Sequence, residues 1–320
     1  MTRNLTADAV LDIASSHAEA PLWHAADRRL DWVEIGVGLL HRFDPVTGRD
    51  DAVAVGSPLG AFAARASGGF VLALEDGFAF LDADRRVTPV ASVHHAAGSP
   101  ARLNDGKCDA KGRFWAGSMA YDCSPGSGAL YRLDPDLRVT KMLDGVTISN
   151  GLDWSTDGRT LFYIDTLAGS SFWDVWSGTV TPGVDAFDVA PETGQLSARR
   201  RLFDIPVETP EPPQMTLPDG MTIDSEGLLW IAVAGSGEVR RYSRRGDVDT
   251  VVHIPVACPT SVTFGGDDLD DLYITSMTPH GAPGPDPRRP EPMWPPRPLE
   301  GALFRCHVGV KGRTPYLFAG

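Results

Sequence analysis

A phrase that recurs six times along the chain is the feature that most limits how this protein can fold. Each copy has a turn with Asp or Gly, then a basic or small residue, then an apolar segment with an aromatic residue. The aromatic residues lie 38, 45, 47, 68 and 43 residues apart. These spacings are close to the ~40–50 residues of one four-stranded propeller blade. The six aromatic residues are Trp32, Phe70, Trp115, Phe162, Trp230 and Tyr273.

The repeat therefore predicts an all-β protein, a six-bladed β-propeller that forms a single domain over residues 1–320. Long segments with helical periodicity are missing, and the apolar runs are short and separated by Gly, Asp and Pro. A β-sandwich or two small barrels would not need a sixfold phrase. Three insertions fall in the loops expected between second and third strands, at 120–128, 167–183 and 278–300. Long loops on a rigid scaffold are where substrate selection tends to lie.

Composition excludes several classes of function. The formal net charge is −13, which repels nucleic acid and anionic membrane surfaces. The four cysteines are far apart, so we expect thiols in a reducing compartment. The sequence has no secretory leader pattern and no long apolar run, so we expect a cytoplasmic protein. Neither a nucleic acid nor a membrane is an expected partner, and the protein is expected to be a monomer or a small homo-oligomer.

Polar residues stand where the innermost strands of four blades are expected to begin: Glu19, Asn104, Asn150 and Asp219. If these positions are equivalent, their side chains meet at the central axis. Buried carboxylates at that distance repel one another unless a cation neutralises them. Oxygen ligands suit a hard divalent cation, which predicts a central metal site. Asn150-Gly and Asp219-Gly are also common turn dipeptides, so each taken alone is open to a turn interpretation.

The chain also resembles a known family over most of its length, from about residue 10 to the end. The phrases that carry the resemblance are EAPLW, RLNDGKCDAKGRFWAGSM, GALYRLDP, SNGLDWSTDGRTLFYIDT, VDAFDVAPETGQLS, PDGMTIDSEGLLWIAV and GVKGRTPYLFAG. They are similar to the regucalcin, or senescence-marker-protein and gluconolactonase, family. The resemblance implies a six-bladed propeller with one divalent metal that hydrolyses a sugar lactone, an aldonolactone such as a glucono-, xylono-, arabino- or galactonolactone, to the aldonic acid.

The resemblance also implies roles for individual residues. Metal ligands fall on Glu19, Asn150 and Asp219, and Asp219 is also the implied catalytic acid or base. Substrate-binding residues fall on Arg102 and Asn104. The family pattern has a Glu after its G-T-M phrase, whereas GSMAYD offers Asp122 here as a shorter substitute. The cation could be Ca²⁺, Mg²⁺, Mn²⁺ or Zn²⁺, with Ca²⁺ favoured.

Several alternatives stay open on the sequence alone. An esterase or organophosphate hydrolase could use the same metal site, because acyl and phosphoryl oxygens are polarised alike. A calcium-binding regulatory protein without turnover, or a propeller that serves as an interaction platform, is also compatible with the fold. Arg102 could instead form a structural salt bridge. The aromatic residues of the insertions, Trp173, Trp176 and Trp294, could line the mouth or anchor loops, and every histidine is expected to be structural or solvated.

Overall fold

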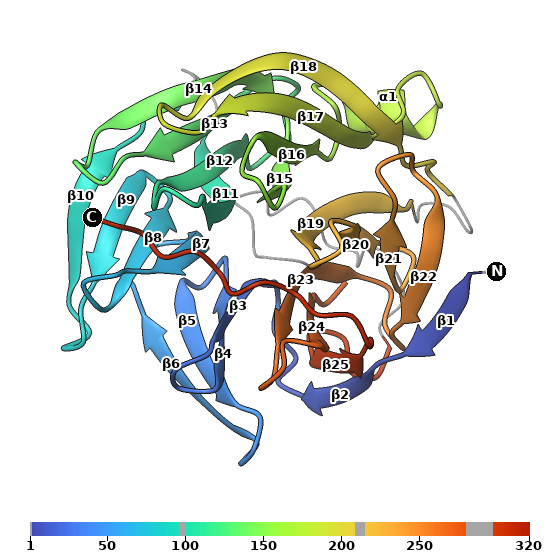
Figure 1. The fold of residues 1–320 in the computed structure, drawn as a ribbon, viewed down its shortest axis with the longest axis horizontal. Coiled ribbons are helices and arrows are strands. Elements are labelled where there is room, and N and C mark those ends of the chain that lie inside the picture. The colour runs from blue at the N-terminus through green and yellow to red at the C-terminus, as the bar shows by residue number, and fades with distance from the viewer. Residues whose placement is uncertain (1, 96–99, 209–214, 280–296) are drawn as a thin grey trace.

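Six antiparallel sheets stand around a central axis in the computed structural model, which describes residues 2–95, 100–208, 215–279 and 297–320 (Figure 1). The predicted six-bladed propeller is confirmed. Each of the first three blades has four strands, which follow one another from the axis outward. They are β3 Ala18–His24, β4 Arg29–Glu34, β5 Leu39–Asp44 and β6 Arg49–Ala54; β7 Leu59–Ala64, β8 Phe70–Leu74, β9 Gly77–Leu81 and β10 Val87–Ser92; β11 Ala101–Cys108, β12 Phe114–Ala120, β13 Gly128–Leu133 and β14 Val139–Val146.

The other three blades include the two N-terminal strands. The fourth blade is regular, and the fifth and sixth each receive an outermost strand from the start of the chain. They are β15 Ser149–Trp154, β16 Thr160–Asp165, β17 Gly183–Ala190 and β18 Gln195–Asp204; β19 Leu217–Ile223, β20 Leu229–Ala234, β21 Glu238–Tyr242, β22 Val248–His253 and β1 Arg3–Thr6; β23 Pro259–Gly265, β24 Asp271–Ser276, β25 Leu303–His307 and β2 Asp8–Leu11.

The chain closes its ring with strands from both of its ends. Strand β2 pairs with β25 in antiparallel orientation, so the sixth blade combines N-terminal and C-terminal residues. Strand β1 adds to β22 in parallel orientation. The innermost strands contact one another in the order β3, β7, β11, β15, β19, β23 and back to β3. The ring therefore has no open edge at the axis.

The recurring phrase marks the second strand of each blade. All six aromatic residues of the phrase lie on β4, β8, β12, β16, β20 or β24. In two blades an Asp in the turn before this strand accepts a hydrogen bond from the tryptophan ring: Trp115 Nε1 donates to Asp109 at 2.9 Å and Trp230 Nε1 donates to Asp224 at 2.9 Å. Both tryptophans are fully buried between blades. The phrase thus combines a turn, a strand and the aromatic that fills the space between sheets.

The C-terminal segment crosses one face of the propeller over the inner strands (red in Figure 1). Its backbone bonds to several blades: Gly312 N donates to Leu269 O at 2.7 Å, and Phe318 N donates to Ala64 O at 2.8 Å. The ring of Phe318 is fully buried and lies 6.1 Å from that of Phe80, measured between centroids. We call this segment, residues 309–320, the C-terminal strap.

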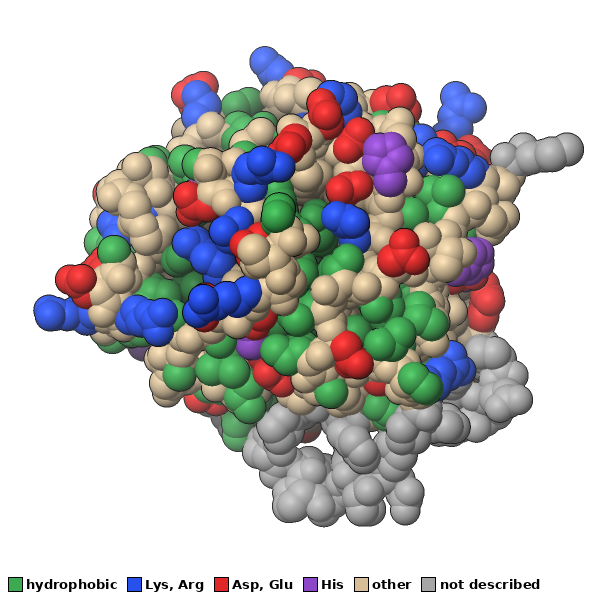
Figure 2. Space-filling view, turned by 90° about the horizontal axis from the view of Figure 1, so that it is seen from below, with side chains coloured by type: hydrophobic (Ala, Val, Ile, Leu, Met, Phe, Trp, Pro, Cys, Tyr) green, Lys and Arg blue, Asp and Glu red, His purple; other side chains and the backbone are tan. Residues whose placement is uncertain are grey.

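Seen from the side, acidic, basic and apolar side chains are interspersed over the surface of the propeller (Figure 2). In the part of the chain that the structure describes, helix α1 Phe172–Trp176 is short, and no helix has the length and apolar character needed to cross a membrane.

Phe318→Ala is expected to lower the free energy of unfolding by about 3–5 kcal/mol, because it leaves a cavity under the C-terminal strap. Leu317→Ala is the matched control, since the neighbouring Leu317 side chain is 47% exposed; its effect should stay within about 0.5 kcal/mol. Urea unfolding of both variants measures the difference, and equal losses would show that the strap does not depend on the buried ring.

Candidate functional site

A break in strand register occurs near the start of every innermost strand, and in four of these strands one of the predicted polar residues lies at or within the break. A β-bulge re-aims the side chain that it carries. The shifts on the strands of interest fall between Glu19 and Leu22 in β3, Leu103 and Gly106 in β11, Asn150 and Leu152 in β15, and Pro218 and Met221 in β19. The same irregularity occurs in β7 and β23.

The polar residues lie within the innermost strands, whereas the sequence placed them immediately before these strands. The turn interpretation of the two dipeptides is wrong, since Asn150-Gly151 and Asp219-Gly220 are both inside strands. Glycine is needed there because neighbouring blades approach closely. A Cβ on Gly151 would lie 2.7 Å from Asp219 O, and one on Gly220 would lie 2.2 Å from Ser261 Oγ.

A cavity of about 470 Å³ opens at this end of the axis and brings together most of the predicted site residues. Glu19, Arg102, Asn104, Asn150 and Asp219 all line it, and all five are buried or nearly buried side chains. They come from four different blades. The closed ring of sheets therefore assembles residues that are up to 200 positions apart in the chain.

A chain of hydrogen bonds fixes the two amides across three blades. Asn104 Nδ2 donates to Asn150 Oδ1 at 2.9 Å and to Ser149 O at 2.7 Å. Asn150 Nδ2 donates to Thr166 Oγ1 at 2.7 Å, and the Thr166 hydroxyl donates to Pro218 O at 2.9 Å. The amide oxygen of Asn150 is therefore held in one orientation at the cavity. Thr166 was missed from the sequence, where it is an ordinary residue after a strand.

Glu19 and Asp219 are carboxyl groups at the cavity with no cation of the chain in direct contact; the Arg102 guanidinium lowers their pKa values only from a longer distance. Burial raises the pKa of Glu19 well above its usual range, and repulsion from Asp219 and Asp105 raises it further. Burial likewise raises the pKa of Asp219, and repulsion from Asp105 adds to the effect. Neither carboxylate lies within 4.0 Å of an Arg, Lys or His nitrogen among the described residues. Such a pair of oxygen donors, with the Asn150 amide, fits a hard divalent cation.

Arg102 lies at the same cavity without a direct ion pair. Its Nη1 donates to Leu103 O at 3.1 Å and to Asn104 Oδ1, and burial lowers the pKa of the guanidinium. A salt bridge across the mouth is not formed within the described residues. His17 also lines the cavity, and burial, together with Arg102, lowers the pKa of His17 to about 3. Its ring is therefore neutral, and it was missed when all histidines were set aside.

Other sequence-based candidates lie apart from this cavity. Asp122 is exposed, accepts a hydrogen bond from Ser124 N at 3.0 Å, and is not part of the cavity lining. Trp173 is 72% exposed, and neither it nor Trp176 lines the cavity, whereas the adjacent Phe172 does. Trp294 falls outside the described residues. The insertion at 167–183 thus reaches the mouth through a residue that the sequence did not single out.

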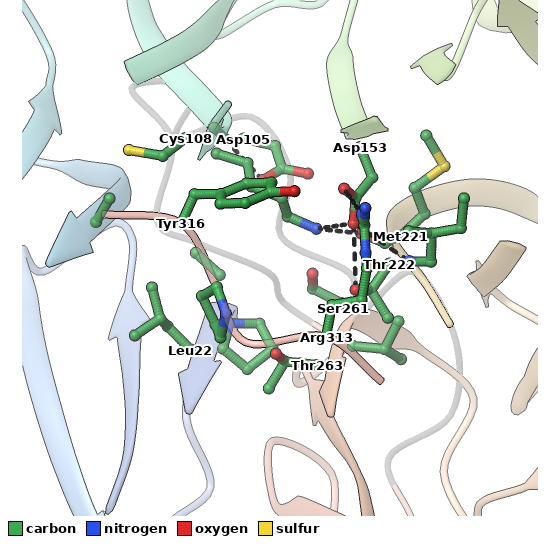
Figure 3. A pocket seen from close by; sticks show the side chains of 18 of the residues that line it. Leu22, Asp105, Cys108, Asp153, Met221, Thr222, Ser261, Thr263, Arg313 and Tyr316 are labelled. Carbon is green, nitrogen blue, oxygen red and sulfur yellow. Dashed lines mark hydrogen bonds and ion pairs between the residues drawn. The ribbon is translucent and has the colours of Figure 1, made fainter. Parts of the chain in front are cut away.

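The opposite end of the axis is closed and has its charges matched. A cavity of only about 60 Å³ lies there under the C-terminal strap (Figure 3). Its buried Asp153 accepts from Arg313 Nη2 at 2.7 Å and from Lys107 Nζ at 3.1 Å. Although burial raises the pKa of Asp153, these two cations hold it below its usual value. Here the chain places two cations in direct contact with the carboxylate, whereas Glu19 and Asp219 have none in direct contact.

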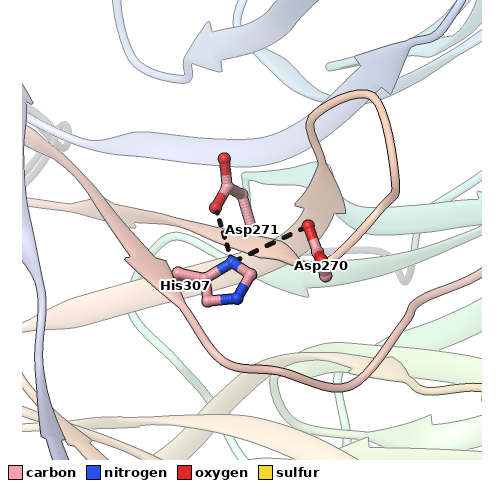
Figure 4. Close-up of side chains that lie close together, drawn as sticks. All are labelled: Asp270, Asp271 and His307. Atoms are coloured by element: carbon pink, nitrogen blue, oxygen red, sulfur yellow. Dashed lines mark ion pairs between the residues drawn. The ribbon is translucent and has the colours of Figure 1, made fainter.

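A further group of potential metal ligands lies on the outside of the sixth blade (Figure 4). His307 Nδ1 is 3.4 Å from Asp271 Oδ1 and 3.7 Å from Asp270 Oδ1. The His307 side chain is 65% exposed. The side chains of Asp270 and Asp271 are half-buried, and none of the three residues lines either of the two cavities, so the group lies at the surface of the blade.

Comparison with known proteins identifies the family of the chain. The family model for the SMP-30/Gluconolactonase/LRE-like region matches residues 17–278. The chain belongs to this family. Regucalcin of Gallus gallus is 38% identical over 311 residues, and regucalcin of Xenopus laevis is 37% identical over 310; both alignments cover 94% of each chain.

Solved structures of other family members have the same fold. A luciferin-regenerating enzyme superposes with a TM-score of 0.82 at 27% identity, covering 98% of this chain and 99% of the other. A protein described as a calcium-binding protein, regucalcin, from Agrobacterium tumefaciens superposes with a TM-score of 0.81 at 24% identity, covering 99% of both chains. A gluconolactonase from Xanthomonas campestris has a TM-score of 0.67 at 22% identity, covering 93% of this chain and 87% of its own.

Asp219→Asn is expected to stabilise this family member when no divalent metal is present. The folded-state pKa of Asp219 is raised, so the folded protein binds a proton that the unfolded chain releases above about pH 4. The free energy of unfolding of the parent therefore falls as pH rises from about 4 toward the raised pKa of Asp219 in the folded state. The side chain of Asp219→Asn has no charge to bury, so its stability should not change in this way. The expected gain at pH 8 is about 1–3 kcal/mol, and it should shrink toward pH 4.

Urea unfolding in the presence of a chelator measures this gain. Asp144→Asn is the control, because Lys141 lowers the pKa of the exposed Asp144 and its replacement should not stabilise. A parent that is as stable as Asp219→Asn at pH 8 would contradict the burial of an uncompensated charge.

Proposed function

We propose that the protein is a metal-dependent hydrolase that opens a lactone ring, with sugar lactones as the first class to test. The observation that carries the proposal is the pair of buried carboxylates, Glu19 and Asp219, at the floor of an open cavity of about 470 Å³. A site with two uncompensated carboxylates and free volume above them can take both a cation and a small substrate.

Three residues would hold the cation: Glu19, Asn150 and Asp219. Their oxygens favour Ca²⁺, Mg²⁺ or Mn²⁺, with Ca²⁺ the first choice, and Zn²⁺ remains part of the test. The three come from the first, fourth and fifth blades. Three protein ligands leave coordination positions for water and substrate. The description of the Agrobacterium tumefaciens relative as a calcium-binding protein supports this choice.

The residues around the cation suggest how the reaction proceeds. When bound, the cation would polarise the lactone carbonyl or lower the pKa of water. Arg102 would donate to the carbonyl or ring oxygen, since only part of its guanidinium is occupied by Leu103 O and Asn104. Asp219 would take a proton from the attacking water and return it to the leaving alkoxide as the ring opens. Such proton transfer contributes about 10²–10⁴ in rate.

Thr166→Val is expected to weaken metal binding by about tenfold or more. The valine keeps the shape of threonine but removes the oxygen that accepts from Asn150 Nδ2. Groups that orient a metal ligand typically contribute 10–100-fold to affinity. Calorimetric titration with Ca²⁺ measures the change. Thr193→Val, at a turn far from the cavity, is the control, and equal affinities for the two variants would exclude this orienting role.

Hydrolysis of lactones by metal-stripped protein, before and after addition of each cation, tests the function itself. We expect turnover that is restored by metal and lowered at least about 10³-fold in Asp219→Asn. Asp144→Asn, on an outer strand, should keep the parent rate. Tight binding of Ca²⁺ with no turnover of any lactone would leave a calcium-binding protein without catalysis; turnover that is indifferent to metal would exclude the proposed site.

A further inference from the structure

The walls of the cavity differ in chemistry from its floor. The charged and amide groups lie together at the axis, whereas six of the other described residues that line the cavity have large apolar side chains. These are Met119, Ile148, Phe172, Met215, Leu217 and Met277. A ligand that reaches the floor must therefore place its body against hydrocarbon and thioether surface.

One wall is part of a hydrophobic cluster that the insertions build. Met119 and Ile148 pack with Leu167 and Val175, which are fully buried behind them, and with Met215 and Leu217. Ser171 is the N-cap residue of helix α1 in the insertion. Its hydroxyl accepts a hydrogen bond from Asp174 N at 3.2 Å in a capping box. The buried Val175 anchors this helix, so Phe172 is held at the cavity mouth.

The polar groups of the cavity are largely used within the protein. The Asn104 amide is bonded to Asn150 and Ser149, and the Thr166 hydroxyl both accepts from Asn150 and donates to Pro218 O. Glu19 and Asp219 are the proposed cation ligands. Among the described residues this leaves the side chains of Arg102 and His17 as the groups that could bond to several substrate hydroxyls.

We propose that the preferred substrate is a lactone with an alkyl or aryl substituent, not a polyhydroxylated one. This inference rests on the proposed lactone hydrolysis and names the substrate class within it. The hydroxyls of a sugar lactone would lose water on entering the cavity and find few partners there. An apolar substituent instead gains from each methylene buried against Met215, Leu217 or Met277.

A series of δ-lactones with the same ring tests the preference. For δ-valerolactone, δ-octalactone and δ-decalactone, kcat/KM should rise about three- to fourfold with each added methylene until the wall is covered. D-Glucono-δ-lactone should fall below δ-decalactone by at least tenfold. A higher kcat/KM for the sugar lactone would overturn the inference while leaving lactone hydrolysis in place.

Two adjacent residues of helix α1 provide a matched pair of variants. Phe172 lines the cavity, whereas Trp173 is 72% exposed and does not. Phe172→Ser should lower kcat/KM for δ-decalactone about three- to tenfold and change that for δ-valerolactone by less than twofold. Trp173→Ser should leave both values unchanged. Met277→Gln, similar in size but polar, should act like Phe172→Ser; equal effects of Phe172→Ser and Trp173→Ser would contradict the assigned wall.

Binding of lactams separates this inference from the proposed function, because lactams resist hydrolysis. In the presence of Ca²⁺, a pentyl-substituted δ-lactam should bind at least tenfold more tightly than D-glucono-δ-lactam, as measured by calorimetry. This result is expected whether or not any lactone is turned over. Equal or tighter binding of the sugar lactam would overturn the apolar preference.

Discussion

The burial of Glu19 and Asp219 with no cation of the chain in direct contact is the constraint on which the site depends. Their electrostatic cost is clearest beside Asp153, a buried carboxylate at the other end of the axis that is paired with both Lys107 and Arg313. The two ends of the channel thus differ in whether a buried carboxylate has a cation of the chain in direct contact. Where the chain supplies the cation, the channel is closed and small; where it does not, the channel is open to about 470 Å³. An open end with unmatched negative charge is suited to an exchangeable metal and its ligand.

The bulges of the innermost strands explain how a regular sheet carries this charge. A strand that kept its register would alternate side chains between its two faces, and the axial residues of six blades would crowd one another. The breaks in register lie at Asn150 and around Asp219, two residues that line the cavity, while Gly151 and Gly220 let the neighbouring blade approach at the same level. Hydrogen bonds from Asn104 to Asn150, from Asn150 to Thr166 and from Thr166 to Pro218 O then link three blades. The amide oxygen of Asn150 is therefore oriented by the strands of the scaffold.

The fold could be predicted from sequence because every blade repeats a turn followed by a strand with an aromatic residue, which is buried in five blades and half-buried, as Phe70, in the second. Trp115 and Trp230 even repeat the bonded Asp six positions earlier. The charged residues of the cavity could also be predicted from sequence, since Glu19 and Asp219 are conspicuous among apolar neighbours. The apolar lining could not be predicted, because Phe172, Met215 and Met277 have no local pattern and meet only when distant loops pack together. Asp122 was favoured for its charge, yet charge does not say which way a loop residue points.

The proposed ligands come together only when the ring of blades is closed. Glu19 lies on the blade that follows the sixth blade, and the sixth is completed only when β2, from the start of the chain, pairs with β25, from its end. The fourth blade, which carries Asn150, lies across the axis from the first, and the fifth blade, which carries Asp219, is next to the sixth. A cation bound to all three residues would bind the closed ring and not the open chain, and so would stabilise closure by mass action. Conversely, any change that loosens the seam would move Glu19 relative to Asn150 and Asp219 and would weaken the proposed metal site without contacting it.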